Sequence, residues 1–473
     1  MLDRHIASLA RDVSTGLPAM MSKRVLGAAL IGAVATLAGC ASYRSEPLDR
    51  APNLASHVSD LEGASNRPIT LADLDRMVLR NNPDLRAARA KLGVAAAQLI
   101  EADLLPNPQV ALSYPFYLAG PNGSDAFSVG VAQDLKSILL RPTRREIAAN
   151  AASAINASLL WQEWQTLGKA RLLFVDIVSG ERAEKALQRN RKFLQERFNL
   201  TNAAINQGNA PLATLSPDLV AVGDVQKSYD DLERLQLNRR HQLNALLGLA
   251  PDAPLPLAGA SETPHVDAQR IRRDLTNLAD RRPDLIALQY GYRSEDAKLR
   301  QAILSQFPNL AIGLVGGRDN SSIYSFGPQA SFELPVFNRN EGAIAMEQAT
   351  REELNREFNA RLTTAAGEIG ALQSEQALLA RQLADIEPRL KEAHLIAGKA
   401  EAAFKQGLFD ERAYVDTQVA QLTREEEKIG VQQALLDGQV ELATLIGAGM
   451  PQVSIGPEPP PADVLGLFQA TIR

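Results

Sequence analysis

The sequence predicts a mainly α-helical protein with a smaller β portion, and three observations carry this prediction. Two stretches of about 65 residues have helical patterns without any loop signal. Each stretch follows a pair of short segments in which apolar residues alternate with small or polar ones. The whole succession of patterns occurs twice along the chain, at an offset of about 200 residues.

The composition is that of a helical globular protein and excludes several classes of function. Hydrophobic residues make up 45% of the 473 residues and charged residues 22%, whereas aromatic residues contribute only 5%. The formal net charge of −5 argues against a nucleic-acid-binding protein, which needs a basic surface. The single cysteine excludes an intrachain disulfide and any site built from several thiolates of one chain.

The N-terminal region has the pattern of a secretory signal. Lys23 and Arg24 precede an uncharged apolar run, residues 25–38, which is too short to span a bilayer as a mature helix. The run ends in Leu-Ala-Gly-Cys, which resembles the lipobox of bacterial lipoproteins and implies acylation of Cys40. The residue after the cysteine is not aspartate, so the resemblance implies the outer membrane. An ordinary signal with a chance cysteine is the alternative.

The residues before this signal do not fit it. Charged residues at positions 3, 4, 11 and 12 precede a second possible start at Met20 or Met21. We therefore assign residues 1–39 to the signal peptide and an extension ahead of the true start. Residues 40–68 are expected to form a lipidated polar linker.

Five short motifs recur in the same order at the same offset, which indicates an internal duplication. The pairs are Pro-Asp-Leu at 83–85 and 283–285, Pro-Asn at 106–107 and 308–309, Asp-Leu at 134–135 with Glu-Leu at 333–334, Gln-Gly at 207–208 and 406–407, and Leu-Leu-Gly at 246–248 with Leu-Ile-Gly at 445–447. The duplication predicts a first repeat at 69–249, a linker at 250–266, a second repeat at 267–449 and a tail at 450–473.

Each repeat is expected to open with a helix and a β-hairpin. The helices are expected at 71–105 and 267–306, with the Asn-Pro and Arg-Pro pairs near their starts or at a local break. Alternating apolar residues predict strands over 110–116 and 127–131, and again over 310–314 and 324–334. Residues rich in Gly, Asn, Asp and Ser separate the strands of each pair, as in tight loops.

Two very long helices are expected to follow the hairpins, at 142–207 and 340–406. At 1.5 Å per residue each would reach about 100 Å. Each is expected to turn at its Gln-Gly pair, Gln207-Gly208 and Gln406-Gly407, and to return as a second helix with a coiled-coil-like apolar seam. Pro388 is expected to kink its helix.

These elements favour a membrane channel made of several copies. Four strands are too few to close a barrel, for which about eight are the practical minimum. An open sheet with an apolar face would leave unpaired edges, which lipid does not tolerate. Three chains would supply about twelve strands, with the helices continuing as a tube. A soluble α+β domain with two small hairpins is the alternative.

The lipobox, the duplication and the repeated unit of helix, hairpin, long helix, glycine turn and helix resemble the TolC-like outer-membrane efflux family. The texture around residues 82–89 and 104–108 also resembles, more weakly, the heavy-metal efflux branch that includes CzcC and CusC. The resemblance implies a homotrimer with a 12-stranded barrel in the Gram-negative outer membrane and a helical tunnel through the periplasm. It further implies a periplasmic adaptor and an inner-membrane, proton-driven RND-type pump as partners.

The resemblance also assigns roles to the two helical turns. Gln207, Gly208, Gln406 and Gly407 would form the periplasmic tip. Asp416 matches a family aspartate that faces the lumen at the constriction, and three copies of it would form a ring that favours cations. A solvated aspartate on a helix surface is the alternative reading. The family's other acidic position is occupied by Ala413, so a double acidic ring is not expected.

No enzyme or resident cofactor is expected. The sequence lacks the common zinc, hydrolase and nucleotide-binding motifs, and its five histidines are scattered without ligand spacing. The alternatives to a channel are a periplasmic adaptor and a lipoprotein scaffold with coiled-coil arms. An adaptor would carry one helical hairpin rather than two, and a scaffold in water would not alternate leucines and isoleucines toward solvent. The sequence does not distinguish metal cations from drugs as the exported solute.

Overall fold

The computed structural model describes residues 43–64, 67–119, 123–259 and 267–450. The chain divides into two compact units, residues 1–53 and 54–473. The described part of the first unit, 43–53, is exposed and contains no helix or strand. The second unit carries all of the described helices and strands.

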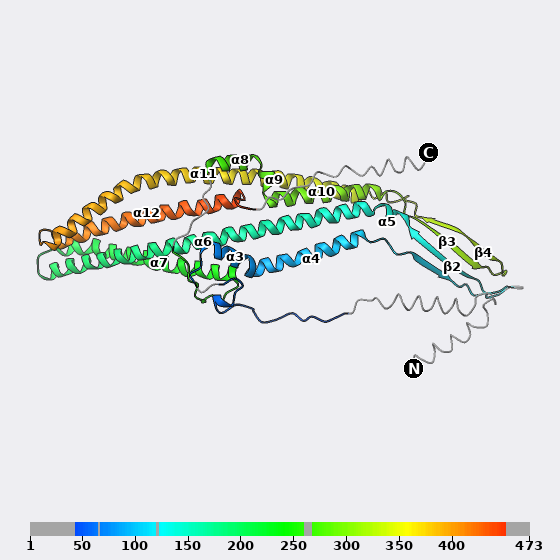
Figure 1. The fold of residues 1–473 in the computed structure, drawn as a ribbon, viewed down its shortest axis with the longest axis horizontal. Coiled ribbons are helices and arrows are strands. Elements are labelled where there is room, and N and C mark those ends of the chain that lie inside the picture. The colour runs from blue at the N-terminus through cyan, green and yellow to red at the C-terminus, as the bar shows by residue number, and fades with distance from the viewer. Residues whose placement is uncertain (1–42, 65–66, 120–122, 260–266, 451–473) are drawn as a thin grey trace, which may run out of the picture. The chain divides into compact units, whose positions relative to one another are not determined.

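The same order of elements occurs twice in the second unit (Figure 1). The first set is η2 (Val58–Asp60), α3 (Leu71–Asn81), α4 (Pro83–Asp103), β1 (Gln109–Ser113), β2 (Phe127–Asp134), α5 (Leu135–Leu139), α6 (Arg141–Asn206), η3 (Leu212–Thr214) and α7 (Leu215–Leu247). The second set is α8 (Ala268–Thr276), α9 (Leu278–Arg281), α10 (Pro283–Leu304), β3 (Leu310–Arg318), β4 (Tyr324–Phe332), α11 (Glu341–Lys405) and α12 (Glu411–Leu445).

The first helix of each set is broken at the residue before a proline. Proline disfavours the helical conformation in the residue that precedes it, and it has no N–H to continue the ladder. Asn82 therefore ends α3 and caps α4, where its side-chain oxygen accepts a hydrogen bond from the Leu85 N–H at 2.9 Å. Its amide nitrogen donates to the carbonyl of Leu246 at 2.9 Å, so the break also binds α7. The structure thus places a local break in each of the two expected helices.

The long helices match the expected bounds to within one or two residues. Helices α6 and α11 contain 66 and 65 residues, which correspond to about 100 Å each. Helix α6 packs against α4, α7, α10 and α12, and α11 packs against α10 and α12. Helix α11 continues through Pro388 without interruption.

The four strands form one antiparallel sheet in the order β1-β2-β3-β4, so β1 and β4 are its edges. Residues that face each other across the register share one face of the sheet. One face is apolar, and the opposite face carries small and polar residues. The large apolar side chains of the first face are exposed: Val110, Leu112, Val129, Val131, Ile312, Leu314, Tyr324, Phe326 and Phe332.

Strand β1 is shorter than the sequence predicts. Its pairing ends at Ser113, whereas the alternation of apolar residues continues to Phe116. Pro115 interrupts the continuation because it lacks a backbone donor. Tyr114 and Phe116 instead lie beyond the ladder with their rings 5.3 Å apart, edge to face.

Three hydrophobic clusters lie between the described helices, and the two larger ones occupy one half of the unit each. The first joins α3, α6, α7 and the segment after α7, and includes Leu74, Phe174 and Leu247. The second joins the segment around α8–α10 to α11 and α12, and includes Leu285 and Ile369. These clusters hold the helices side by side along one direction (Figure 1). The sheet lies at one end of the helices, and the turns of α6–α7 and α11–α12 lie at the other.

Candidate functional site

The two reversals of the long helices have the geometry expected for glycine turns. Gly208 has φ of 76° and Gly407 has φ of 71°, and each follows a glutamine that ends a long helix. A Cβ at either glycine would meet no atom within 4 Å. The left-handed backbone, rather than crowding, therefore explains the glycine at each turn.

Both turns close through hydrogen bonds back to the preceding helix. In the first, the N–H of Asn209 donates to the carbonyl of Ala204 at 2.8 Å. In the second, the N–H of Leu408 donates to the carbonyl of Ala403 at 2.9 Å. Leu212 and Leu408 are 71% and 76% exposed, so each turn presents a leucine to solvent. Gln207, Gly208, Gln406 and Gly407 lie at these reversals, and their assignment to a periplasmic tip stays a prediction.

Asp416 belongs to an ion-pair network close to the turns. It lies on α12, and its Oδ1 accepts a hydrogen bond from Nη1 of Arg197 on α6 at 3.0 Å. The Nε of the same arginine lies 3.0 Å from Oδ1 of Asp218 on α7. One guanidinium therefore joins α6, α7 and α12.

The centre of the network is Asp218 rather than Asp416. The side chain of Asp218 is 3% exposed, whereas that of Asp416 is 47% exposed. Asp218 accepts a hydrogen bond from the Thr201 hydroxyl and lies 3.4 Å from Nη2 of Arg412 on α12. Nη1 of Arg412 also donates to the Thr201 hydroxyl at 2.7 Å. A buried carboxylate with two guanidiniums and a hydroxyl is well compensated. Moving one of these partners away alone is unfavourable, because it leaves buried charge uncompensated.

Sequence reasoning found Asp416 but missed the other members of this network. Arg197 and Asp218 lie 11 residues before and 10 residues after Gly208, so a helical hairpin that turns there brings them together. Asp218 also precedes Asp416 by 198 residues, close to the offset of 199 between the two turn glycines. The internal duplication therefore indicates Asp218 as the first-repeat counterpart of Asp416.

An aromatic cluster supports the same end of the helices. The rings of Phe404 and Tyr414 stack with centroids 4.8 Å apart and an interplanar angle of 2°. Phe193 of α6 meets Tyr414 edge to face at 6.3 Å. Burial raises the pKa of Tyr414, and the nearby Glu401 and Glu196 carboxylates raise it further. These contacts fix α12 between α11 and α6 next to the ion-pair network.

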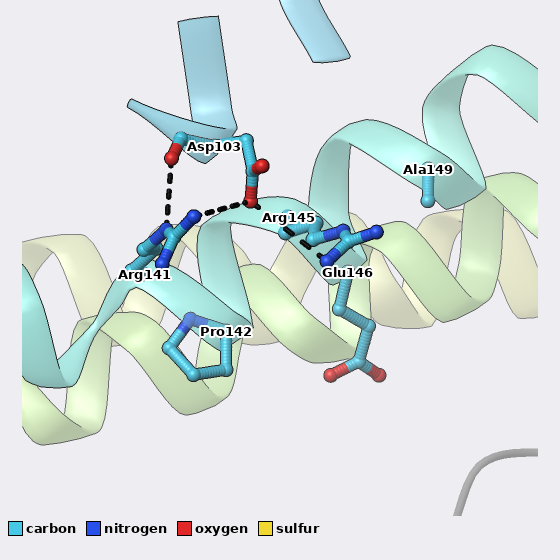
Figure 2. Close-up of a pocket in the computed structure, with 6 residues that line it drawn as sticks. All are labelled: Asp103, Arg141, Pro142, Arg145, Glu146 and Ala149. Atoms are coloured by element: carbon cyan, nitrogen blue, oxygen red, sulfur yellow. Dashed lines mark hydrogen bonds and ion pairs between the residues drawn. The ribbon is translucent and has the colours of Figure 1, made fainter. Parts of the chain in front are cut away.

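A hollow of about 380 Å³ lies at the other end of the helices, where α4 meets the start of α6. Figure 2 shows its lining, with Arg141 and Arg145 directed toward Asp103. Arg141 donates through Nε to the Asp103 carbonyl at 2.8 Å, and its Nη2 lies 3.2 Å from Oδ1. Nη1 of Arg145 lies 3.9 Å from the same oxygen. The ion pairs tie α4 to α6 just below the sheet.

Across the described residues, no three His, Cys, Asp or Glu side chains gather in a way that could hold a metal ion.

Among the helices of the described ranges, none combines the length and the apolar character needed to cross a membrane.

Cys40, the expected lipidation site, lies outside the described residues.

A model of the outer membrane efflux protein family matches residues 275–448. The outer membrane protein VceC of Vibrio cholerae is 15% identical, with a TM-score of 0.65 over 80% of this chain and 97% of that one. The open state of the MtrE channel of Neisseria gonorrhoeae is 16% identical, with a TM-score of 0.64 over 87% and 99%. CusC is 17% identical, with a TM-score of 0.62 over 87% and 100%. No curated protein matches the sequence. The predicted fold class is confirmed.

Proposed function

We propose that the chain is a TolC-like outer membrane efflux protein and the channel subunit of a tripartite efflux system. Its family and its fold are those of channel proteins rather than enzymes. In this proposal three copies form a duct that carries small solutes, metal cations or drugs, from a pump to the exterior. The subunit works with a periplasmic adaptor and a proton-driven RND-type pump in a Gram-negative envelope.

The observation that carries the proposal is the exposed apolar face of the four-stranded sheet. Nine large apolar side chains of that face are exposed. Soluble monomers rarely expose contiguous apolar patches of this kind. Strands β3 and β4 contain nine residues each, which is the length that a tilted strand needs to span the apolar layer. Lipid on one face and an aqueous lumen on the other would satisfy both faces.

The edges of the sheet support an assembly of several copies. The outer sides of β1 and β4 have no partner strand within the described chain. Unpaired backbone groups cost several kcal/mol each in lipid, so they need another chain. Pairing β1 of one copy with β4 of the next in a ring of three gives twelve strands, since each copy supplies four.

The long helices would continue the duct away from the membrane. Their length of about 100 Å places the turns at Gly208 and Gly407 far from the sheet. The exposed Leu212 and Leu408 suit docking to the adaptor there. A lipid anchor on Cys40 would attach the same chain to the membrane a second time.

Asp416 is proposed as the gate residue at this tip. Its ion pair with Arg197 holds α12 on α6 and neutralises part of its charge. A ring of three Asp416 side chains would therefore favour cations most strongly once these pairs have opened.

The test is to purify the mature chain from outer membranes in detergent and to measure its mass and its single-channel conductance in a planar bilayer. The proposal predicts a trimer with discrete conductance steps that prefers cations, and a changed cation preference for Asp416→Ala. A monomer that stays soluble without detergent and carries no current would refute it and favour the adaptor or the scaffold.

A further inference from the structure

A second polar cluster lies between the long helices, away from both turns and from the sheet. It contains Asp176 of α6, Arg239 of α7, Glu375 of α11, and Asp437 and Glu441 of α12. Four carboxyl groups from three helices thus share one nearby guanidinium. Such an excess of like charges between packed helices is unfavourable when all the carboxyls are ionised.

The single guanidinium is already engaged by Asp176. Nη2 of Arg239 donates to Oδ1 of Asp176 at 2.8 Å, and both side chains are largely buried, at 15% and 21% exposed. The amide of Gln433, also on α12, donates to the same Asp176 oxygen. Arg182 of α6 lines the hollow beside Gln433, but its guanidinium donates to the carbonyl of Gly259 at 3.1 Å.

Asp437 is left without comparable compensation. Its Oδ1 is buried and has no hydrogen-bond partner. Burial and the nearby charges of Asp176 and Glu441 together raise the pKa of this carboxyl to about 7, although Arg239 and a hydrogen bond from Gln433 act against them. Burial also raises the pKa of Glu441, with Glu375 and Asp176 adding to the effect. The cluster therefore takes up protons near neutrality.

Two glycines near the cluster accommodate glutamine side chains that reach across from the neighbouring helices. A Cβ at Gly438, next to Asp437, would lie 2.0 Å from the Gln376 amide nitrogen of α11. A Cβ at Gly180, one turn beyond Asp176, would lie 1.2 Å from the Gln236 amide nitrogen of α7. Both glycines leave space for a glutamine side chain from the neighbouring helix, so polar side chains occupy the interface around the carboxyl groups.

We infer that the cluster of Asp176, Asp437 and Glu441 makes the packing of α12 on α6 sensitive to pH, with the packing weakening as the pH rises from acidic values to neutrality. The neutral Asp437 carboxyl brings no net charge into the helix interface, where its Oδ1 is buried. The ionised carboxylate faces Asp176 across the helix interface with no cation of its own.

The direction of the pH dependence follows from the linkage between proton binding and helix packing. The pKa of Asp437 is raised in the folded state relative to the ordinary value of 3.8, so the packed state binds the proton more tightly than a state with α12 displaced. The stabilisation is fully present below about pH 4 and is lost between there and about pH 7. The opening equilibrium of α12 rises over that window, by at most about tenfold per pH unit for one proton.

The consequence for transport rests on the proposed channel function. Helix α12 continues from this cluster to Asp416 and the turn at Gly407. A weaker hold on α12 in the middle of the bundle would lower the resistance to opening at its tip. A duct with this device would open more readily in neutral surroundings than in acidic ones.

The test is hydrogen exchange by mass spectrometry on the intact protein in detergent, from pH 5 to pH 8, with rates corrected for the chemical effect of pH. Peptides covering residues 430–445 are expected to show an opening equilibrium that increases at least about tenfold between pH 5 and pH 7. Asp437→Asn keeps the shape but not the charge, and it is expected to abolish most of that increase.

Two further variants keep the test decisive. Glu441→Gln removes a neighbouring negative charge, so it is expected to move the midpoint of the pH response to lower pH. This variant also tests the inference if Asp437→Asn fails to assemble. Glu427→Gln lies on the same helix with a 42% exposed side chain and is expected to retain the wild-type response. A wild-type response that is flat, or an unchanged response in Asp437→Asn, overturns the inference. A retained response in a protein that carries no current would overturn the proposed channel function and leave the inference standing.

Discussion

Replacing Arg197 with methionine tests whether the ion-pair network near the turns holds α12 in place. Methionine keeps much of the side-chain volume and removes the charge. The variant breaks two contacts, one with the buried Asp218 and one with the half-exposed Asp416. Because the two carboxylates differ in burial, the structure predicts that the two losses differ in size.

The larger loss is expected at Asp218. Removing one partner of a buried ion pair typically costs about 3–5 kcal/mol, because the remaining charge is left uncompensated. Asp218 keeps Arg412 at 3.4 Å and the Thr201 hydroxyl, so we expect about 2–3 kcal/mol. The pair with Asp416 is 47% exposed on the carboxylate side and is expected to contribute less than about 1 kcal/mol.

The two contributions can be separated by double-mutant cycles. The variants are Arg197→Met, Asp218→Asn and Asp416→Asn, with the two double variants. The quantity measured is the opening free energy of α12 near residues 411–420, from hydrogen exchange of the detergent-solubilised protein. The coupling of Arg197 to Asp218 is expected to exceed its coupling to Asp416 by at least about 1 kcal/mol.

The control is Arg424→Met on α12, the helix whose opening is measured. Arg424 pairs with Glu427 at the surface, with side chains 46% and 42% exposed, and its loss is expected to cost less than about 0.5 kcal/mol. The reasoning fails if the coupling to Asp416 equals the coupling to Asp218, or if Arg424→Met costs as much as Arg197→Met. Single-channel recordings on the same proteins are expected to show a higher open probability for Arg197→Met than for Arg424→Met.

Two further predictions concern the turn and the sheet. Gly407→Ala is expected to destabilise the protein by about 1 kcal/mol because φ is positive there. Gly367→Ala in the middle of α11, where a Cβ meets nothing within 4 Å, is expected to stabilise it by up to about 1 kcal/mol. Thermal unfolding of the two purified variants compares the effects, and equal effects would contradict the turn argument. Leu314→Arg on the exposed apolar face of the sheet is expected to impair insertion into liposomes at a cost of about 2–4 kcal/mol. Val315→Arg on the opposite face is expected to insert normally. Equal insertion of the two variants would refute the assignment of the faces.

Most of the fold could be predicted because its elements are long or strongly punctuated. A stretch of 66 residues in α6 has no competing loop signal, and the glycines at 208 and 407 fix where each helical hairpin reverses. The break at Asn82 follows from the proline after it. The strands follow from their alternation, except that the alternation does not report where pairing ends, and Pro115 ends it early.

The candidate site could be predicted only in part, since ion pairs across helices are set by the rotation of each helix about its axis. Arg197 and Asp416 are 219 residues apart, and no local pattern indicates that they meet. The acidic cluster around Asp437 is hidden for the same reason, because its members come from α6, α11 and α12. A carboxyl group on a helix of mixed composition looks like an ordinary solvated residue until the packing partner is known.

The two near-equivalent aspartates at the turns show how a duplicated architecture can acquire an asymmetric function. Asp218 and Asp416 occupy almost the same place relative to their glycines, and both lie within ion-pair distance of Arg197. One of them is buried and held within the α6–α7 hairpin by Arg197 and Thr201 of α6, with Arg412 of α12 as a further, half-exposed partner. The other is half exposed and held by a single contact, so it is the weaker of the two and yields first when α12 moves. Because burial sets the strength of each pair, the first hairpin is expected to act as the frame and the second as the moving part.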